Sequence, residues 1–460
     1  MGKMLHPYRK YRQSAVQWIG DLPEHWGINR VRNLITKERS GTWGEDPNGG
    51  DDDIVCIRVA DFDSSAGGIK TVDSYTRRYV PKKERLKRLL KPHKSFLIEK
   101  SGGGELQPVG RIVQFDKTFE AISSNFISSF ETRDGFDTQF FLYLSQSMYS
   151  LGLNAPSVKQ TTGIQNLDTR HYFQTRVPFP PLSEQRAIAD FLDRETARID
   201  GIVEKEKKLI ELLKEKRSAL ITRAVTKGLD PDVKMKPSGV EWVGPVPKHW
   251  DVIRIRKALS ILTDFTANGS FASLAENVEY LPEGYSRLVR LTDLRENLEN
   301  EGIYVDEHAH RFLSKSELSG GEILLANVGA YTGFVCMMPT INMKATLGPN
   351  MYLLKFKNGV MNRYIYYLLS SGMYFQVFQI KASASAQPKI NKRDVKDETI
   401  LIPPVQEQRA IAALLDRETS QLDAQVSKIE EQIGLLDEYK RSVTTAAVTG
   451  KIDVRGMQNA

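Results

Sequence analysis

The chain contains few of the residues that carry chemistry in metalloproteins and disulfide-rich proteins. Among its 460 residues there are only 2 cysteines and 7 histidines. Cys56 and Cys336 cannot form a disulfide framework, and they fit a reducing cytoplasm. The "HAH" triplet from His308 to His310 has no evident third ligand. We therefore predict no metal site, and a surface strand or loop at this triplet.

Long apolar runs and catalytic motifs are also missing. No segment approaches the roughly 18 consecutive apolar residues of a membrane helix, so we expect a cytoplasmic protein without membrane association. There is no G-x-x-x-x-G-K-[ST] phosphate loop, which argues against nucleotide hydrolysis. The glycines of "SGGGELQPVG" are wrongly spaced for a dinucleotide fingerprint, and the Pro-Pro segments lack the flanks of an amino-methyltransferase motif. No cysteine–histidine set or carboxylate pair supports hydrolysis, and we predict no catalytic residue.

The chain does contain an internal duplication. "EQRAIADFLDRETARID" (184–200) returns as "EQRAIAALLDRETSQLD" (407–423), with 12 of 17 positions identical. "SAVQWIGDLPEHW" (14–26) returns in the same way as "SGVEWVGPVPKHW" (238–250). The separation between copies drifts in the middle of the repeat, as loop insertions in two copies of one fold would cause. Because the ends match and the interiors differ, we infer one kind of task performed on two different targets.

The repeat predicts the domain organisation. We expect a mixed α/β fold with two similar globular domains separated by two long helices. The predicted boundaries are residues 1–181 for the first domain, 182–236 for the central helical spacer, 237–404 for the second domain and 405–460 for the C-terminal helical spacer.

Both spacers carry an apolar stripe. Apolar residues recur at alternating spacings of three and four across 188–220 and 411–443, which is the pattern of a heptad seam. We predict that the two helices form an antiparallel coiled coil within the chain; the alternative is two independent arms that dimerise with other chains. Glu195 and Glu418 occupy equivalent seam positions, where they either set the register or mark the point at which the stripe meets solvent.

The charge distribution permits a polyanionic partner. The net charge is +7, and residues 77–94 contain nine Lys and Arg and one acid, Glu84. This stretch is either a solvated helix face or a surface that contacts phosphates without reading sequence.

Base reading requires amide, hydroxyl and guanidinium groups close to small residues. Two small-polar loops (155–166 and 381–394) and two glycine-rich turns supply them. Arg58 and Arg290 occupy equivalent strand positions, and each either pairs with the aspartate three residues later or reaches a base or phosphate. The candidate DNA-binding residues are Arg58, Gly102, Gly103, Gly104, Gln107, Arg111, Lys159, Gln160, Thr161, Thr162, Arg290, Tyr331, Thr332, Ser383, Ser385, Gln387 and Lys389.

The paired W-x-G-x-x-P-x-H-W openings, the paired "PP-x-x-EQRAIA-x-x-LDRET" phrases and the paired helix ends "AVTKG" and "AVTGK" resemble one known family. They resemble the specificity (S) subunits of Type I restriction–modification systems, in the family's order and over nearly the whole chain. The resemblance implies two target recognition domains, each reading one half of a bipartite sequence in double-stranded DNA. It implies that the helical spacers hold these domains apart.

The resemblance also implies partners. The spacers would dock two methyltransferase (modification) subunits, and motor-nuclease restriction subunits would join the complex. S-adenosylmethionine, ATP and Mg²⁺ would belong to those partners, with no cofactor in this chain, which would be a non-catalytic subunit required for methylation and cleavage. The implied partner-binding residues are Glu184, Gln185, Arg186, Arg194, Glu407, Gln408, Arg409 and Arg417.

The two domains depart from each other at one turn. "SGGGELQPVGR" in the first has no close equivalent in the second, where "NVGAYTG" stands, so we expect different half-sites. A free-standing nuclease or methyltransferase is disfavoured by the missing motifs. A coiled-coil adaptor that binds only proteins is the remaining alternative.

Overall fold

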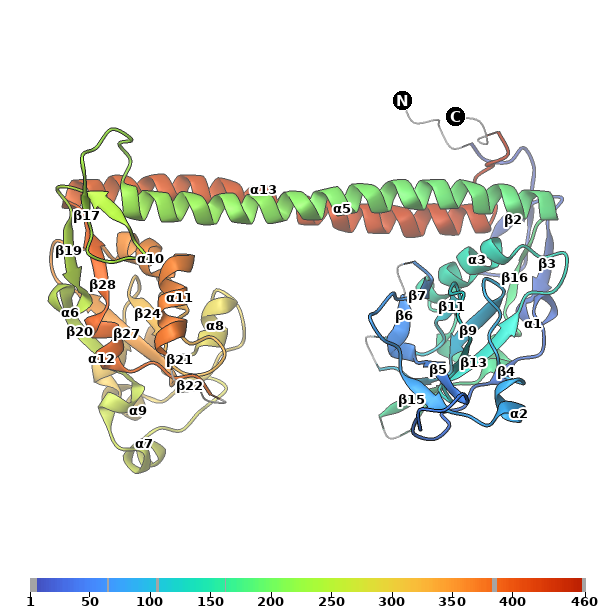
Figure 1. Cartoon of the computed structure of the whole chain (residues 1–460), viewed down its shortest axis with the longest axis horizontal. Helices are drawn as coiled ribbons and strands as arrows, with labels where there is room; N and C mark the ends of the chain where they lie inside the picture. The colour runs from blue at the N-terminus through green and yellow to red at the C-terminus, as the bar shows by residue number, and fades with distance from the viewer. Residues whose placement is uncertain (1–5, 64–65, 105–106, 162, 383–386, 457–460) are drawn as a thin grey trace. The chain divides into compact units, whose positions relative to one another are not determined.

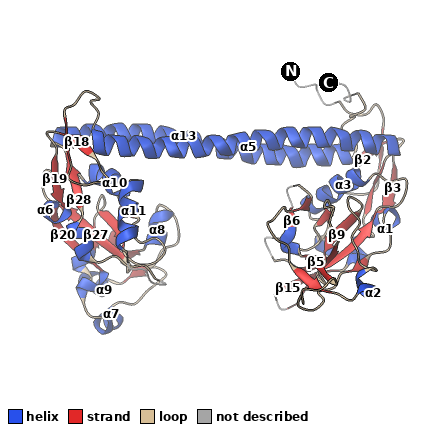
Figure 2. Ribbon diagram, viewed as in Figure 1, coloured by secondary structure: helices blue, strands red, loops and turns tan. Residues whose placement is uncertain are grey.

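The computed structural model describes residues 6–63, 66–104, 107–161, 163–382 and 387–456. The chain divides into two compact units, one made of residues 1–206 with 431–460 and the other of residues 207–430. Each unit holds one globular domain and one half of each long helix. Figures 1 and 2 show the strands of each unit gathered next to its part of the helix pair.

The first unit is built around an antiparallel sheet. The central strand β9 has the sequence SFLIE and is buried at every position, as expected for a strand covered on both faces. The order of this sheet is β4 (Arg39–Ser40), β13 (Ile127–Glu131), β9 (Ser95–Glu99) and β11 (Ile112–Gln114). A second sheet has the order β12 (Ala121–Ser123), β5 (Asp53–Ile57) and β8 (Arg77–Tyr79), with β12 and β5 parallel.

The second unit repeats this topology. Its main sheet has the order β20 (Leu259–Asp264), β27 (Met351–Phe356), β24 (Ile323–Ala326) and β25 (Val335–Met337). Its second sheet has the order β22 (Tyr304–Val305), β21 (Ser286–Val289), β26 (Lys344–Leu347) and β23 (Glu317–Leu318), with β21 and β26 parallel. The mixed α/β fold with two similar domains is therefore confirmed.

Two short strand pairs also recur. They are β1 (Tyr11–Gln13) with β2 (Asp21–Pro23) and β3 (Gly27–Arg30) with β16 (Arg176–Phe179) in the first unit, and β17 (Met235–Pro237) with β18 (Pro245–Pro247) and β19 (Asp251–Arg254) with β28 (Thr399–Ile402) in the second. The β3–β16 pair and the β19–β28 pair each join the start of a domain to the strand that leads into the Pro-Pro segment before its long helix.

The long helices are α5 (Leu182–Lys227, 46 residues) and α13 (Val405–Val448, 44 residues). In the first unit, Ile188 and Leu192 near the start of α5 share a core with Val443 near the end of α13. In the second unit, the end of α5 shares a core with Ile411 and Leu415 at the start of α13. The helices therefore pair antiparallel within the chain, as predicted.

Ion pairs across the two helices repeat with the sequence. In the first unit, Lys440 Nζ lies 2.7 Å from Asp200 Oδ1. In the second unit, Arg217 Nε lies 3.0 Å from Asp423 Oδ1. Each member of one pair is 223 residues from its counterpart in the other (440 − 217 and 423 − 200). The duplication thus extends to individual contacts between the helices.

The predicted stripe is right for α13 and partly wrong for α5. On α5 the predicted seam continues through Leu209, but Leu209 is 44% exposed and Ile210 is buried. Ile199, Ile210 and Ile221 are all buried and are spaced by 11 residues, which is three turns at about 3.67 residues per turn. This spacing is close to the period of a straight α-helix and longer than the roughly 3.5 residues per turn of a heptad repeat. After Ile199 the buried position therefore falls one residue later than the heptad predicts, at Ile210.

The two seam glutamates pair along their own helices. Glu195 Oε1 lies 2.6 Å from Arg198 Nη2, and Glu418 Oε1 lies 2.9 Å from Arg417 Nη2. The buried residues at this level are Thr196 and Thr419. Of the two readings of these glutamates, the structure supports the one in which they mark the edge of the stripe.

The "HAH" triplet lies in helix α9 (Glu307–Phe312), so the expected strand or loop is wrong. Asp306 caps this helix by accepting a hydrogen bond from the backbone of Ala309. His310 is buried and its Nδ1 lies 3.0 Å from Ser286 Oγ. Among the described residues, no group of three or more His, Cys, Asp or Glu side chains is placed to hold a metal ion.

Candidate nucleic-acid interface

In the first domain, the glycine-rich turn (residues 101–104 and 107–111, called the glycine turn below) and the small-polar loop form one surface. Strand β10 (Ser101–Gly102) pairs with β15 (Ile164–Leu167), which also pairs with β14 (Val158–Thr161). The loop predicted from composition is therefore mostly a β-hairpin, and its ladder brings it to the glycine turn. The turn requires glycine, because Gly102 and Gly103 have φ of +116° and +61°.

The polar side chains on this surface differ in their freedom. Gln107 and Gln160 are exposed, and Gln160 has no side-chain partner among the described residues. Lys159 is exposed and its Nζ lies 2.9 Å from Asp168 Oδ2. Arg111 stacks on Tyr149, with 5.6 Å from Cζ to the ring centroid. Thr162 lies outside the described residues. The side chain of Thr161 is likewise not described.

Two buried residues beneath this surface were missed by the sequence analysis. Gln165 is buried and its Oε1 accepts a hydrogen bond from Val109 N at 3.2 Å, which ties the hairpin to the turn. Glu99 is 3% exposed, and its Oε2 has no hydrogen-bond partner among the described residues. Burial raises the pKa of Glu99 to about 7, against the opposing charge of Arg111. A strand-end glutamate gives no sequence signal of this kind, because burial comes from the fold.

The second domain brings the corresponding segments together by a different route. Val328 forms an isolated antiparallel bridge with Lys389, and Gly329 N donates to Pro388 O at 2.9 Å. Gln387 and Lys389 are exposed beside this bridge. Ser383 and Ser385 lie outside the described residues. The glycine turn and the polar loop thus meet in both domains, although the first domain uses a hairpin and the described part of the second uses a single bridge.

The side chain of Thr332 faces the protein interior. It is fully buried, and Oγ1 donates to Gly329 O at 2.7 Å and lies 2.9 Å from Pro388 O. It holds the turn against the loop, and this structural role accounts for the residue without a DNA contact. A threonine in a glycine-rich turn has the same sequence signature whether its hydroxyl faces the backbone or a ligand.

Tyr331 has a partner that the sequence did not reveal. Tyr331 is 44% exposed. The guanidinium of Arg295 lies over its ring at 4.5 Å from the centroid, and Arg295 Nη1 donates to Tyr331 Oη at 2.8 Å. Arg295 ends helix α8 (Leu291–Arg295), 36 residues before the tyrosine. The pair presents a ring and a cation together at the surface of the second domain.

The two equivalent arginines both form the predicted ion pair. Arg58 Nη2 lies 3.0 Å from Asp61 Oδ1, and Arg290 Nη2 lies 2.7 Å from Asp293 Oδ1. In each case the aspartate also accepts a hydrogen bond from the arginine's own backbone N–H. The side-chain hydrogen bonds that the two guanidinium groups donate to Asp61 and Asp293 raise the pKa of Arg58 and Arg290. The arginine side chains remain 41% and 35% exposed, so the pairing orients them and leaves one side open.

The basic stretch 77–94 is not one helix face. It begins in strand β8, and its helix α2 (Lys82–Arg85) has only four residues. Several cations in it have acidic neighbours: Arg78 with Asp46, Arg85 with Asp52, Arg88 with Glu84 and Lys91 with Glu131. The exposed lysines with no partner among the described residues are Lys82, Lys83, Lys87 and Lys94.

The comparison with known proteins decides the family. The chain matches the Type I restriction modification DNA specificity domain twice, over residues 53–212 and 295–434. It belongs to this family. It is 24% identical over 430 residues to the Type I restriction enzyme EcoKI specificity subunit of Escherichia coli, covering 90% of this chain and 85% of that protein. It is also 24% identical over 330 residues to the MjaVIII specificity subunit of Methanocaldococcus jannaschii, covering 69% of this chain and 71% of that protein.

Solved structures share the fold. A chain from the work "Structural basis underlying complex assembly and conformational transition of the type I R-M system" matches with a TM-score of 0.68 at 16% identity, covering 94% of this chain and 99% of that one. The HsdS subunit from Thermoanaerobacter tengcongensis matches with a TM-score of 0.52 at 17% identity, covering 94% of this chain and 98% of that one.

Membership in the Type I specificity family fixes the general function. The chain recognises DNA sequence within a Type I restriction–modification system, and its two target recognition domains match a bipartite target. Its curated relatives carry the name of specificity subunits. None of the described helices is long and apolar enough to span a membrane.

The family phrase "EQRAIA" is explained largely by contacts inside the chain. Gln185 and Gln408 are fully buried; Oε1 of each accepts a hydrogen bond from the backbone of its own domain, at Asp137 and Met361. Their Nε2 atoms donate to Pro180 O and Pro403 O at the Pro-Pro turns. These internal hydrogen bonds account for both glutamines without a contact to another subunit.

The glutamate of the same phrase also contacts its own domain. Glu184 is buried and accepts hydrogen bonds from Trp26 Nε1 at 2.9 Å and Tyr8 Oη at 3.0 Å. His25 Nε2 lies 2.7 Å from Glu184 Oε1, and His249 Nε2 lies 2.7 Å from Glu407 Oε2. In both copies, the histidine of the repeated W-x-G-x-x-P-x-H-W motif therefore contacts the glutamate that begins the EQRAIA phrase.

The arginines of the phrase keep exposed side chains, and Arg417 is paired with Glu418 on its own helix. Arg186, Arg194, Arg409 and Arg417 are exposed on the long helices. The aspartates of the repeated "DRET" are used internally, since Tyr143 Oη donates to Asp193 and Tyr367 Oη donates to Asp416. Within the repeated phrase, the glutamine and the DRET aspartate of each helix thus contact their own domain, and the arginines are exposed.

Proposed function

We propose that each target recognition domain reads one half of a bipartite duplex sequence through its glycine turn and polar loop. The observation that carries this proposal is the backbone pairing of those two segments in both domains, at β10–β15 and at Val328–Lys389. Paired main chains hold the loop in one position, and the glycines let a base edge approach closely. Exposed side chains such as Gln107, Gln160 and Gln387 then supply the hydrogen-bonding groups.

The positively charged groups around these segments would position the duplex. The four exposed lysines of 77–94 and the outward sides of Arg58 and Arg290 are suited to phosphate contacts, which fix orientation without carrying sequence information. Differences between the turns, including the Arg295–Tyr331 pair in the second domain, support different half-sites.

The partners follow from the family and from the outward arginines. We propose that the paired helices dock two methyltransferase subunits, with Arg186 and Arg194 on one copy of the phrase and Arg409 and Arg417 on the other. The chain itself would be non-catalytic and would hold no cofactor. S-adenosylmethionine, ATP and Mg²⁺ would be bound by the methyltransferase and restriction subunits, whose activities would depend on this chain.

Methylome sequencing of cells that carry the complete operon tests the proposed function. Deletion of this gene should remove one split methylated motif, and re-expression should restore it. Replacement of residues 14–180 by the corresponding domain of another family member should alter one half of the motif and leave the other half intact. A methylome unchanged by the deletion would rule the function out, and a swap that altered both halves would rule out one domain per half-site.

A further inference from the structure

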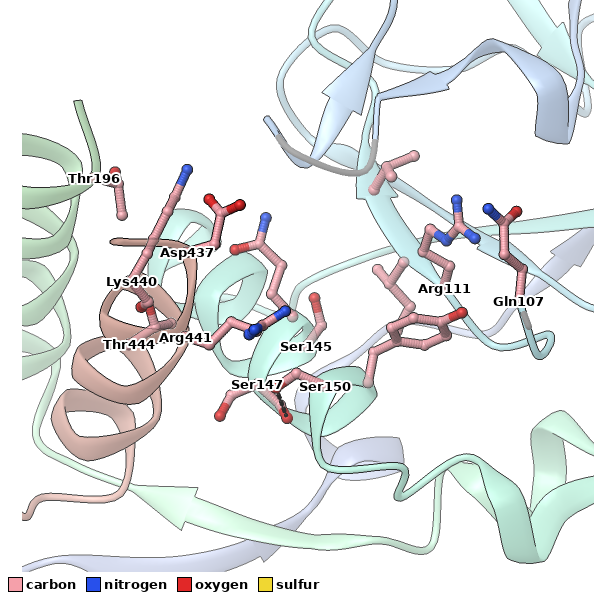
Figure 3. Close-up of a pocket in the computed structure, with 14 residues that line it drawn as sticks. Gln107, Arg111, Ser145, Ser147, Ser150, Thr196, Asp437, Lys440, Arg441 and Thr444 are labelled. Carbon is pink, nitrogen blue, oxygen red and sulfur yellow. Dashed lines mark hydrogen bonds between the residues drawn. The ribbon is translucent and has the colours of Figure 1, made fainter. Parts of the chain in front are cut away.

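A cleft in the first unit joins the recognition domain to the long helices. It has a volume of about 430 Å³. Figure 3 shows Gln107 and Arg111 of the glycine-turn region on one side, and Lys440 and Arg441 of α13 on the other. Between them lies the end of helix α3 (Thr138–Ser150). The cleft therefore continues from the proposed base-reading surface to a part of the chain that sequence analysis assigns only to spacing and subunit docking.

Arg441 is the cation in this cleft that is not already engaged. Lys440 is neutralised by Asp200, at 2.7 and 2.8 Å from its two carboxylate oxygens. Arg441 is exposed, and it has no hydrogen bond or ion pair with any described residue. Asp437 is the acidic residue of the lining, one turn before Arg441. With Arg111 on the opposite wall, the cleft keeps a net positive charge.

The hydroxyl groups in the cleft are largely committed to the protein. Ser150 Oγ donates to Ser147 O, and Thr444 Oγ1 donates to Lys440 O. Both α3 and α13 approach the cleft with their carboxyl ends, so helix dipoles give an anion no support here. An anionic ligand would therefore depend on the side-chain cations, above all on the guanidinium of Arg441.

The second unit has a smaller cleft at the corresponding place. Its volume is about 160 Å³, and it lies between the end of α5 and the residues that follow helix α10 (Asn362–Ser370). Arg217 lines it and is paired with Asp423, as Lys440 is with Asp200. Lys214 also lines it, is exposed, and has no partner among the described residues. Each cleft thus contains one cation paired across the helices and one unpaired cation.

We propose that these clefts are sites for the DNA backbone, where Arg441 in the first unit and Lys214 in the second each contact a phosphodiester group. The proposal rests on the DNA-binding function above and adds the spacer helices to the DNA-contacting surface. A duplex seated on the glycine turn of the first domain continues past it along the cleft. Single cations of this kind strengthen binding to any sequence and leave the base preference unchanged.

The test is the salt dependence of binding by the assembled complex. The probes are a duplex carrying the motif found by methylome sequencing and a scrambled duplex of equal length. For Arg441→Ala, the slope of log K against log salt should fall by about 0.9, and for Arg441→Ala with Lys214→Ala by about 1.8. Affinity for both duplexes should drop together, so that the ratio between them stays at the wild-type value.

Charge-matched controls separate a phosphate contact from a change in net charge. Lys205 and Lys428 are exposed, lie on the same two helices and line neither cleft. Lys205→Ala with Lys428→Ala should leave the slope near the wild-type value. An unchanged slope in the Arg441 and Lys214 variants would overturn the proposal.

Two other outcomes are distinct. If the cleft variants assemble poorly with the methyltransferase subunits in mass photometry while keeping the wild-type salt slope, the clefts bind protein and the proposal is wrong. If the wild-type complex itself shows no preference for the motif duplex over the scrambled one, the proposed function fails. If the wild-type complex prefers the motif duplex but the variants keep the wild-type salt slope, the proposed phosphate contact is wrong and the proposed function stands.

Discussion

Glu99 is a buried carboxyl directly behind the first recognition surface. It is 3% exposed, and no described residue forms a hydrogen bond with its Oε2. Burial raises its pKa from 4.5 to about 7, with Arg111 acting in the opposite direction. Between these two pH values the folded chain holds a proton that the unfolded chain releases. Its contribution to stability is therefore fully present below about pH 4.5 and is lost as pH rises through about 7.

Glu99→Gln should remove this pH dependence. The amide stays neutral, so the free energy of unfolding should rise by about 1–3 kcal/mol at pH 8 and change little at pH 4.5. Urea unfolding of the chain across this range measures the difference. Glu24→Gln, at an exposed site, is the control and should show no such pH dependence. An equal change in the free energy of unfolding at every pH would show that the pKa of Glu99 is not raised in the folded chain.

Gln160 is the exposed side chain whose contact with a base is most easily tested. It stands on β14 without a partner among the described residues, so its removal leaves nothing else unpaired. If its amide makes a bidentate pair with a base, Gln160→Ala should weaken discrimination at one position of one half-site by about 1–3 kcal/mol.

Competition binding with duplexes varied one base pair at a time measures the Gln160→Ala effect. Gln17→Ala, at an exposed position outside the turn and the hairpin, should bind like wild type. A Gln160→Ala complex with wild-type discrimination at every position would limit this side chain to packing or solvent contact.

The glycine turn is the element whose backbone geometry makes close approach possible. Gly103 has φ of +61°, and a Cβ there would lie 2.9 Å from Gln107 O. Gly104 has open space around it and no left-handed φ. The two adjacent positions therefore separate backbone strain from the simple presence of a methyl group.

Gly103→Ala should destabilise the turn by about 1–2 kcal/mol, because an L-residue is strained in this conformation. Recognition of one half-site should weaken, and the other half-site should be read normally. Gly104→Ala should be close to neutral in thermal unfolding. Methylation kinetics on substrates altered in each half-site measure the effect. Equal behaviour of the two variants would mean that the turn rearranges freely.

The junctions between the long helices and their domains explain why the EQRAIA motif occurs twice. Gln185 and Gln408 fasten each helix to its own Pro-Pro turn, and Glu184 and Glu407 fasten it to the histidine of the repeated opening. These contacts fix the direction in which each domain leaves its helix. The same chemistry appears twice because the same junction has to be built twice.

At the scale of the whole molecule, both long helices run from one unit into the other, and the division between the units falls after Glu206 on α5 and after Glu430 on α13. Insertion of four residues after both positions should lengthen each helix by about 6 Å, at about 1.5 Å per residue. This corresponds to about two base pairs at about 3.4 Å each. We expect a motif whose central gap is longer by about two base pairs and whose half-sites are unchanged.

Methylome sequencing of the insertion strain reads the gap directly. A four-residue insertion in the exposed loop at Gly49, where nothing lies within 4 Å of an added Cβ, should leave the motif unaltered and serves as the control. Changed half-site bases with an unchanged gap would refute the role of the helices as the spacer.

The duplication, the mixed α/β class, the two long helices and the family could be predicted from the sequence alone, because these depend on periodicity and on repeated motifs. The antiparallel pairing of the helices within the chain was one of two alternatives until the shared cores were seen. The sequence could not determine which way a repeated side chain faces. Gln185, Gln408 and Thr332 are polar residues of the kind that bind ligands, but all three are buried and hydrogen-bond within the chain. Likewise, Leu209 and Ile210 are equally apolar, and only packing between the helices buries Ile210.

The tertiary structure also decided which distant segments meet. Ser101 and Asn166 pair across 65 residues, and Val328 pairs with Lys389, through backbone hydrogen bonds that leave no trace in side-chain identity. Arg441 and Lys214, which have no partner among the described residues, could be distinguished from Lys440 and Arg217 only because the structure shows the latter two paired across the helices. Local pattern specifies helices and strands, whereas burial and pairing arise only when the chain closes on itself.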